Sequence, residues 1–216
     1  VDRSRQVVEK LTRGVSFLLK KNNVEHIQGT GTLKDPHNVL VRESGQTLST
    51  SNVVIATGAR FREFPSLPVD GETVITSREA LELREVPERV VIIGAGATGV
   101  EFAYVYRSYG ADVTLIELLP RLVPLEDEEL SRQLERSFQA QGIKSMTGSR
   151  VDGIGVDRGI AKVSVSNASA SSSIECDKVL VSVGMQGNVE DIGLEDVGVH
   201  TEHGYISIND KMETNV

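Results

Sequence analysis

Residues 89–117 read RVVIIGAGATGVEFAYVYRSYGADVTLIE and contain the most informative pattern of the chain. Four consecutive apolar residues, Val90 to Ile93, have the length and β-branching of a strand that is buried on both faces. The glycine turn, defined here as residues 94–99 (GAGATG), follows directly and leads into an expected helix over residues 97–109. A second short apolar strand is expected over residues 113–116. The pattern therefore predicts strand, glycine turn, helix and strand.

The glycines of this turn have separate physical roles in a site for a dinucleotide. Gly94 permits the tight turn, Gly96 has no Cβ and lets a pyrophosphate approach the backbone, and Gly99 lets helix and strand pack closely. The free N–H groups at the helix start face the phosphates. Glu117 follows Gly99 by 18 positions, near the spacing at which an acid reaches the adenosine ribose. We therefore predict an α/β unit that binds a dinucleotide; the alternative is an α/β turn without a ligand.

Composition excludes several functional classes. The 216 residues carry a net charge of −8 and no stretch dense in Lys or Arg, which argues against nucleic acid or an anionic membrane surface as partner. No apolar run approaches ~20 residues, so no membrane span is predicted and a soluble, cytoplasmic protein is the expectation. The single cysteine, Cys176, excludes an internal disulfide, and its place in an expected strand favours a structural thiol.

The N-terminal third is expected to form one helix and several strands. Residues 3–21 repeat apolar side chains every three or four positions, which predicts an amphipathic helix with one buried face. Short strands are expected at residues 24–28 and 38–42, with a third after a polar turn. Residues 53–56 read as a buried strand. Prolines and glycines at residues 61–71 mark a crossing between two domains, or alternatively a surface loop.

The region after the glycine turn is expected to complete the sheet. A capping box at Thr76 to Glu79 predicts a short helix, and the acids at residues 127–129 predict the start of a helix that Gly142 ends. A strand is expected to begin at Ile143. Three strand-like runs joined by turns follow as a β-meander, at residues 151–156, 161–165 and 174–176. Residues 179–183 read as one more buried parallel strand.

Four motifs together resemble the pyridine nucleotide-disulfide oxidoreductases, a flavoprotein family. They are VVIATGARFREFP (residues 53–65), VPERVVIIGAGATGVEFA (86–103), GADVTLIELLPRLVPLEDEEL (110–130) and VLVSVG (179–184). The resemblance implies a Rossmann-like NAD-binding domain at residues 67–188, flanked by parts of a truncated FAD-binding domain at residues 1–66 and 189–216. On this view the chain is a central fragment of a longer protein.

The resemblance also implies site residues. The NAD side would be formed by Gly94, Ala95, Gly96, Ala97, Thr98, Gly99, Glu101, Glu117 and Gly184, and the FAD side by Thr30, Gly31, Ala56, Thr57 and Gly58. Glu101 would lie near the nicotinamide. A carboxylate in an otherwise apolar helix needs a partner or a ligand, although an exposed acid near a helix start is the alternative. Residues 185–187 (MQG) depart from the Arg-Arg-Pro usual in the family, so contacts after Gly184 are left open.

By the same resemblance, the parent protein would pass two electrons from dihydrolipoyl groups through a redox disulfide and FAD to NAD. Its partners would be the lipoyl-bearing acyltransferase of 2-oxoacid dehydrogenase complexes and a second copy in a homodimer. The family's cysteine pair and His/Glu pair are not in this sequence, so no catalytic residue is predicted. The four histidines suit surface or structural roles, and no metal-ligand pattern is present. The alternatives are a mercuric or glutathione-type reductase and a free-standing nucleotide-binding module.

Overall fold

The computed structural model describes residues 1–216, which divide into two compact units. The central unit is the continuous segment Phe61–Gly184. The flanking unit combines Asp2–Arg60 with Met185–Val216. The domain boundaries predicted after residues 66 and 188 lie a few residues further along the chain than these divisions. The assignment of the units to particular cofactors stays a prediction.

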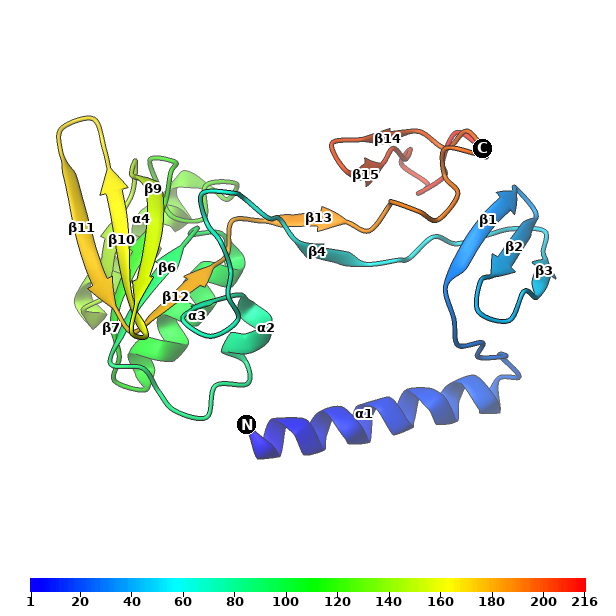
Figure 1. The fold of residues 1–216 in the computed structure, drawn as a ribbon, viewed down its shortest axis with the longest axis horizontal. Coiled ribbons are helices and arrows are strands. Elements are labelled where there is room, and N and C mark those ends of the chain that lie inside the picture. The colour runs from blue at the N-terminus through cyan, green and yellow to red at the C-terminus, as the bar shows by residue number, and fades with distance from the viewer. The chain divides into compact units, whose positions relative to one another are not determined.

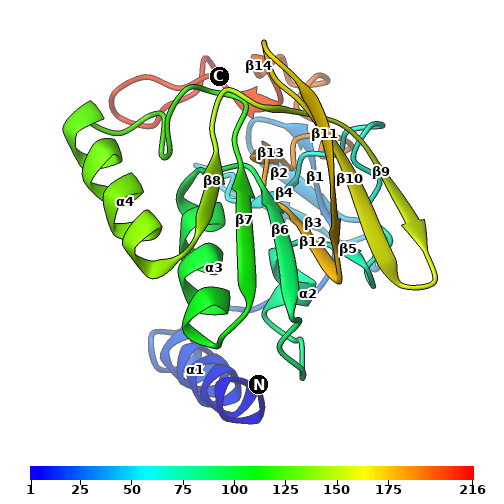
Figure 2. The ribbon, with the colours of Figure 1, turned by 90° about the vertical axis from the view of Figure 1, so that its left-hand side faces the viewer.

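A five-stranded parallel sheet forms the middle of the central unit (Figure 2). Every neighbouring pair in it is parallel. The strands run in the order β5 (Val74–Ile75), β12 (Lys178–Val181), β6 (Arg89–Ile93), β7 (Asp112–Ile116) and β8 (Lys144–Met146). β6 is bonded on both sides, and Val90 to Ile93 are each at most 5% exposed. The predicted α/β class and the buried central strand are confirmed.

Three helices cover one face of this sheet: α2 (Ser77–Ala80), α3 (Ala97–Ser108) and α4 (Glu128–Gln141). Ala103 and Tyr106 of α3 pack in one cluster with Ile92 of β6 and Leu115 of β7, because alternate strand residues point to the same face. The capping box predicted for α2 forms. Gly142 ends α4 in the left-handed conformation, as its position predicted.

A three-stranded antiparallel meander covers the other face (Figure 1). It consists of β9 (Arg150–Asp157), β10 (Ile160–Ser166) and β11 (Ser171–Cys176). Val163 and Cys176 pack against Val91 and Val179, the strand residues that point away from the helices. Burial raises the pKa of the Cys176 thiol to about 11. The predicted meander and the structural thiol are both confirmed.

The flanking unit contains one long helix and short antiparallel strands. Its elements are α1 (Asp2–Lys21), β1 (Gly31–Asp35), β2 (Asn38–Val41), β3 (Thr47–Ser49), β4 (Ala59–Phe61), whose last residue falls in the central unit, β13 (Met185–Gly187), β14 (Thr201–Glu202) and β15 (Tyr205–Ile206). Leu33, Leu194 and Val199 form its small core. β1, β2 and β3 make one sheet, β4 pairs with β13, and β14 pairs with β15.

The predicted helix at the N-terminus is confirmed, but its predicted buried face is wrong. No residue of α1 is buried; Leu11 is 64% exposed and Leu18 54%. Amphipathic spacing indicates an apolar stripe but does not supply the surface that covers it. None of the helices is both long and apolar enough to cross a membrane.

Two predicted strands are also absent. Residues 24–28 and 53–56 have no strand conformation. A strand needs a neighbouring strand to bond its backbone groups, and neither segment has one. Val54 is accordingly 89% exposed, while Val53 and Ile55 pack against the small core of the flanking unit. The alternate apolar side chains of residues 53–56 are therefore packed on one side only, without a strand.

Candidate functional site

The glycine turn lies at the carboxyl end of β6 and connects this strand to α3 (Figure 2). Gly94 has a φ of 97°, and a Cβ at this position would lie 2.5 Å from the carbonyl oxygen of Ser182. A Cβ at Gly99 would lie 1.9 Å from the carbonyl oxygen of Gly94. The tight turn predicted at Gly94 and the close packing predicted at Gly99 are therefore present.

Gly96 differs from these two glycines because the space beside it is open. A Cβ added to Gly96 would meet no atom within 4 Å, and the residue has an ordinary φ of −70°. Gly96 is the N-cap of α3, and no side chain caps the helix. The N–H groups of Ala97 and Thr98 are among those that a helix leaves without an intrahelical acceptor. An anion placed against Gly96 would find free space and N–H donors.

Glu117 lies beside the glycine turn, at the carboxyl end of β7. Its side chain is buried, with the residue 8% exposed. Its Oε2 accepts a hydrogen bond from the Ala95 N–H at 2.7 Å, and its Oε1 accepts one from the Leu119 N–H at 2.8 Å. A carboxylate has roughly four lone-pair positions, so these two bonds leave about two for a ligand. The spacing along the sequence predicted the position of Glu117 but not its hydrogen bond with the Ala95 N–H.

Neighbouring elements fix the rest of the turn. The Gly94 N–H donates to the Ile116 carbonyl at 2.8 Å, and the Val123 N–H donates to the Ala95 carbonyl at 2.8 Å. The Ser182 hydroxyl lies 2.9 Å from the carbonyl oxygens of both Ile93 and Gly94. Ser182 was not predicted as a site residue. The only signal for it was a polar residue that interrupts the apolar run VLVSVG.

Glu101 and Gly184, the other two residues predicted for the NAD side, also belong to the central unit. Glu101 is exposed, so its carboxylate is hydrated and the argument that burial requires a partner does not apply. Gly184 has a φ of 107° and accepts a hydrogen bond from the Arg62 N–H at 3.2 Å. The roles predicted for both residues stay predictions.

The residues predicted for the FAD side lie in the flanking unit. The Thr30 N–H and hydroxyl both donate to the Glu43 carboxylate at 2.7 Å, and these bonds lower the pKa of Glu43. The Thr57 hydroxyl donates to the Asn188 carbonyl at 2.7 Å. Both threonine hydroxyls are thus engaged, with different partners. Gly31 begins β1, whereas Ala56 and Gly58 are exposed residues outside any strand. No common hydrogen bond joins the two segments.

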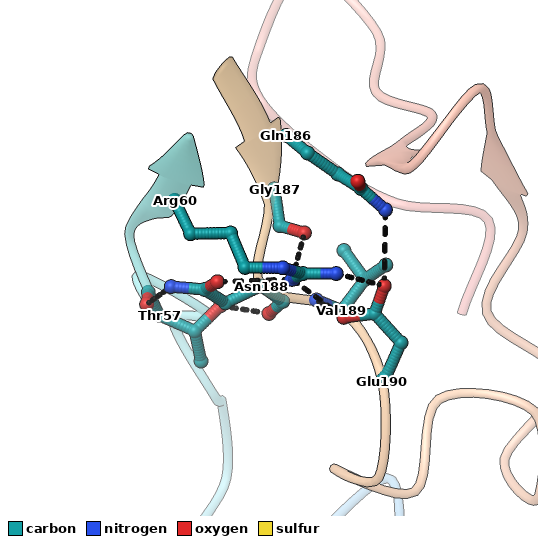
Figure 3. A network of polar contacts seen from close by, with 7 residues as sticks. All are labelled: Thr57, Arg60, Gln186, Gly187, Asn188, Val189 and Glu190. Atoms are coloured by element: carbon teal, nitrogen blue, oxygen red, sulfur yellow. Dashed lines mark hydrogen bonds and ion pairs between the residues drawn. The ribbon is translucent and has the colours of Figure 1, made fainter. Parts of the chain in front are cut away.

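A polar network in the same unit was not predicted at all (Figure 3). The Arg60 guanidinium donates to both carboxylate oxygens of Glu190 at 2.8 and 2.9 Å, and to the carbonyl oxygen of Gly187 at 3.2 Å. The Asn188 side-chain oxygen also accepts from Arg60, at 3.1 Å. The hydrogen bonds from Arg60 are the main cause that lowers the pKa of Glu190 to about 2. The network fixes residues 57–60 beside residues 187–190.

The parallel sheet, with helices on one face and a meander on the other, defines an α/β protein with a glycine turn at a strand end. The family model described as "Pyridine nucleotide-disulphide oxidoreductase" matches residues 2–216. The chain belongs to this family. It is 40% identical over 218 residues to the dihydrolipoyl dehydrogenase of Chlorobaculum tepidum, covering 99% of this chain and 46% of that protein. It is also 40% identical over 222 residues to the dihydrolipoyl dehydrogenase of Mycobacterium leprae, covering 100% and 47%.

Solved structures with the same fold include LpdA from Mycobacterium tuberculosis, with a TM-score of 0.86 at 24% identity. That comparison covers 99% of this chain and 48% of LpdA. The HOCl-induced flavoprotein disulfide reductase RclA from Escherichia coli has a TM-score of 0.77 at 24% identity, covering 97% and 49%. At this identity the likeness concerns the fold alone. The chain spans about half the length of the relatives that it matches.

Proposed function

We propose that this chain is the NAD-binding part of a dihydrolipoyl dehydrogenase. The observation that carries the proposal is the open space at Gly96, which lies at an uncapped helix start and next to a buried carboxylate. The N–H groups at the start of α3 would bind the pyrophosphate, and Glu117 would accept hydrogen bonds from the adenosine ribose. When bound, NAD accepts a hydride. Gly184 and Glu101 are proposed to lie along the rest of the dinucleotide.

The whole protein would carry two electrons from dihydrolipoyl groups through a redox disulfide and FAD to NAD. The names of the relatives at 40% identity support this activity. We propose that the flanking unit contributes to the FAD site through Thr30, Gly31, Ala56, Thr57 and Gly58. The proposed partners are a lipoyl-bearing acyltransferase of a 2-oxoacid dehydrogenase complex and a second copy of the chain, and the proposed location is the cytoplasm.

The charge of Glu117 favours NAD(H) over NADP(H). Its carboxylate accepts hydrogen bonds from ribose hydroxyls but repels a 2′-phosphate, and a reductase that uses NADPH would favour Arg there. A charge-assisted hydrogen bond contributes ~1.5–3 kcal/mol, so we expect NADH to bind about tenfold more tightly than NADPH, or better.

Titration calorimetry with both cofactors measures this preference directly. Glu117→Gln keeps the shape of the side chain, removes the charge and should narrow the difference between the two cofactors. Equal or tighter binding of NADPH to the unmodified chain would show that the assignment of Glu117 is wrong.

A further inference from the structure

We propose that Ser182 is a positioning residue for the glycine turn. Its hydroxyl would hold the turn in the orientation that presents the N–H groups of α3 to a pyrophosphate. This inference rests on the proposed function, because it concerns how tightly the same site binds a dinucleotide.

Ser182 directly follows β12 and is half-buried against the turn. Its N–H donates to the Ile93 carbonyl at 2.8 Å, continuing the pairing of β12 with β6. Its hydroxyl lies 2.9 Å from the same carbonyl oxygen and 2.9 Å from the carbonyl oxygen of Gly94. With alanine at position 182, the N–H would still donate to the Ile93 carbonyl, and the Gly94 carbonyl would have no donor from this residue.

The Gly94 carbonyl belongs to a peptide group that is held at both ends. Its oxygen accepts from Ser182, and the N–H of the same peptide, which is that of Ala95, donates to Glu117 at 2.7 Å. A peptide group is planar, so two bonds at opposite ends fix its rotation. This peptide lies one residue before Gly96, and its orientation therefore influences the direction of the N–H groups that follow.

Close packing around the Gly94 carbonyl oxygen leaves little room for a hydrogen-bond donor other than Ser182. A Cβ at Gly99 would lie 1.9 Å from this oxygen, so the first turn of α3 packs directly against it. The same added Cβ would lie 3.0 Å from the Ser182 hydroxyl oxygen. The hydroxyl thus occupies the point where β12, the glycine turn and α3 meet, and its loss leaves a partly buried carbonyl without this donor.

The test compares Ser182→Ala with Ser182→Thr, which keeps a hydroxyl, and with Ser108→Ala. The Ser108 hydroxyl donates to the Tyr104 carbonyl at 2.7 Å near the far end of α3, so its removal is a matched loss of one hydroxyl away from the turn. NADH affinity is measured by titration calorimetry on the whole chain. A second readout is hydrogen exchange of the Ala95 amide, whose N–H belongs to the held peptide and donates to Glu117, followed by NMR without any ligand.

We expect Ser182→Ala to weaken NADH binding about fivefold, which corresponds to the loss of one hydrogen bond, and to speed exchange of the Ala95 amide. Ser182→Thr should restore both, and Ser108→Ala should change neither. Unchanged affinity and exchange in Ser182→Ala would overturn the proposal, as would equal effects in Ser108→Ala. If the unmodified chain does not bind NADH, the proposed function fails. In that case the exchange experiment by itself tests the role of Ser182, and unchanged exchange in Ser182→Ala overturns that role.

Discussion

At the scale of single residues, Glu117 and Ser182 act on the same peptide group from two different strands. Glu117 stands at the end of β7 and accepts from the Ala95 N–H, and Ser182 follows β12 and donates toward the Gly94 carbonyl. Each side chain is thereby tied to the backbone of the turn before any ligand is considered. A variant of either residue is expected to change the geometry of the turn as well as a direct contact.

Cys176 allows a prediction about pH. Burial raises the pKa of its thiol from 9.0 to about 11, so the folded state favours the neutral form. The stability from this group is fully present below pH 9 and is lost as the pH rises toward 11. Between pH 8 and 10.5 we expect a loss of about 2 kcal/mol in the free energy of unfolding.

Urea unfolding of the chain and of Cys176→Ala at both pH values measures this loss. Between these pH values, the free energy of unfolding of Cys176→Ala should fall by about 2 kcal/mol less than that of the unmodified chain. Burial also raises the pKa of Tyr106, to about 12, and this contribution is common to both proteins and cancels in the comparison. An identical dependence on pH in the two proteins would contradict the burial of the thiol.

At the scale of elements, the contact between α3 and β6 depends on Gly99. A Cβ at Gly99 would lie 1.9 Å from the Gly94 oxygen, whereas one at Gly96 would meet nothing within 4 Å. Gly99→Ala must therefore move the helix away from the strand, and we expect the free energy of unfolding to fall by about 2 kcal/mol or more. Gly96→Ala should change it by less than about 1 kcal/mol. Urea unfolding followed by circular dichroism compares the two variants, and equal free energies of unfolding would contradict the packing role of Gly99.

Elements with complete local signals were predictable from the sequence. The apolar run at β6, the capping box of Thr76 and Glu79, and the glycine that ends α4 specify their own structure within a few residues. Residues 53–56 have the same apolar character as β6 but no neighbouring strand, so their backbone is not paired. The spacing of α1 likewise predicts the helix but not whether its stripe is covered.

The candidate site was also predictable only where its residues lie in one continuous stretch of sequence. Its glycines and Glu117 were found because a strand, a helix and an acid occur at a known spacing in one continuous stretch. Ser182 and the Arg60–Glu190 pair were missed because each contact joins segments separated by more than 80 residues. Such contacts depend on the order of strands in the sheet, which spacing along the chain does not encode.

At the scale of the whole molecule, the central unit contains all residues of its own two cores. Both apolar clusters on the faces of the parallel sheet come from residues within Phe61–Gly184. We therefore expect residues 61–184, expressed alone, to fold and to bind NADH with the same affinity as the whole chain. Calorimetric titration and thermal unfolding of this segment test the expectation. A segment that folds but does not bind NADH would place part of the site in the flanking unit.

The most direct test of the proposed function is NADH binding to Gly96→Val, measured by titration calorimetry beside the unmodified chain. The space beside Gly96 is open and its φ is ordinary, so the variant should fold with a loss of only about 1 kcal/mol. Its side chain would fill the position assigned to the pyrophosphate. We predict that the unmodified chain binds NADH and that the folded variant gives no measurable heat of binding. A folded variant that binds NADH as tightly as the unmodified chain would contradict the placement of the dinucleotide at the glycine turn.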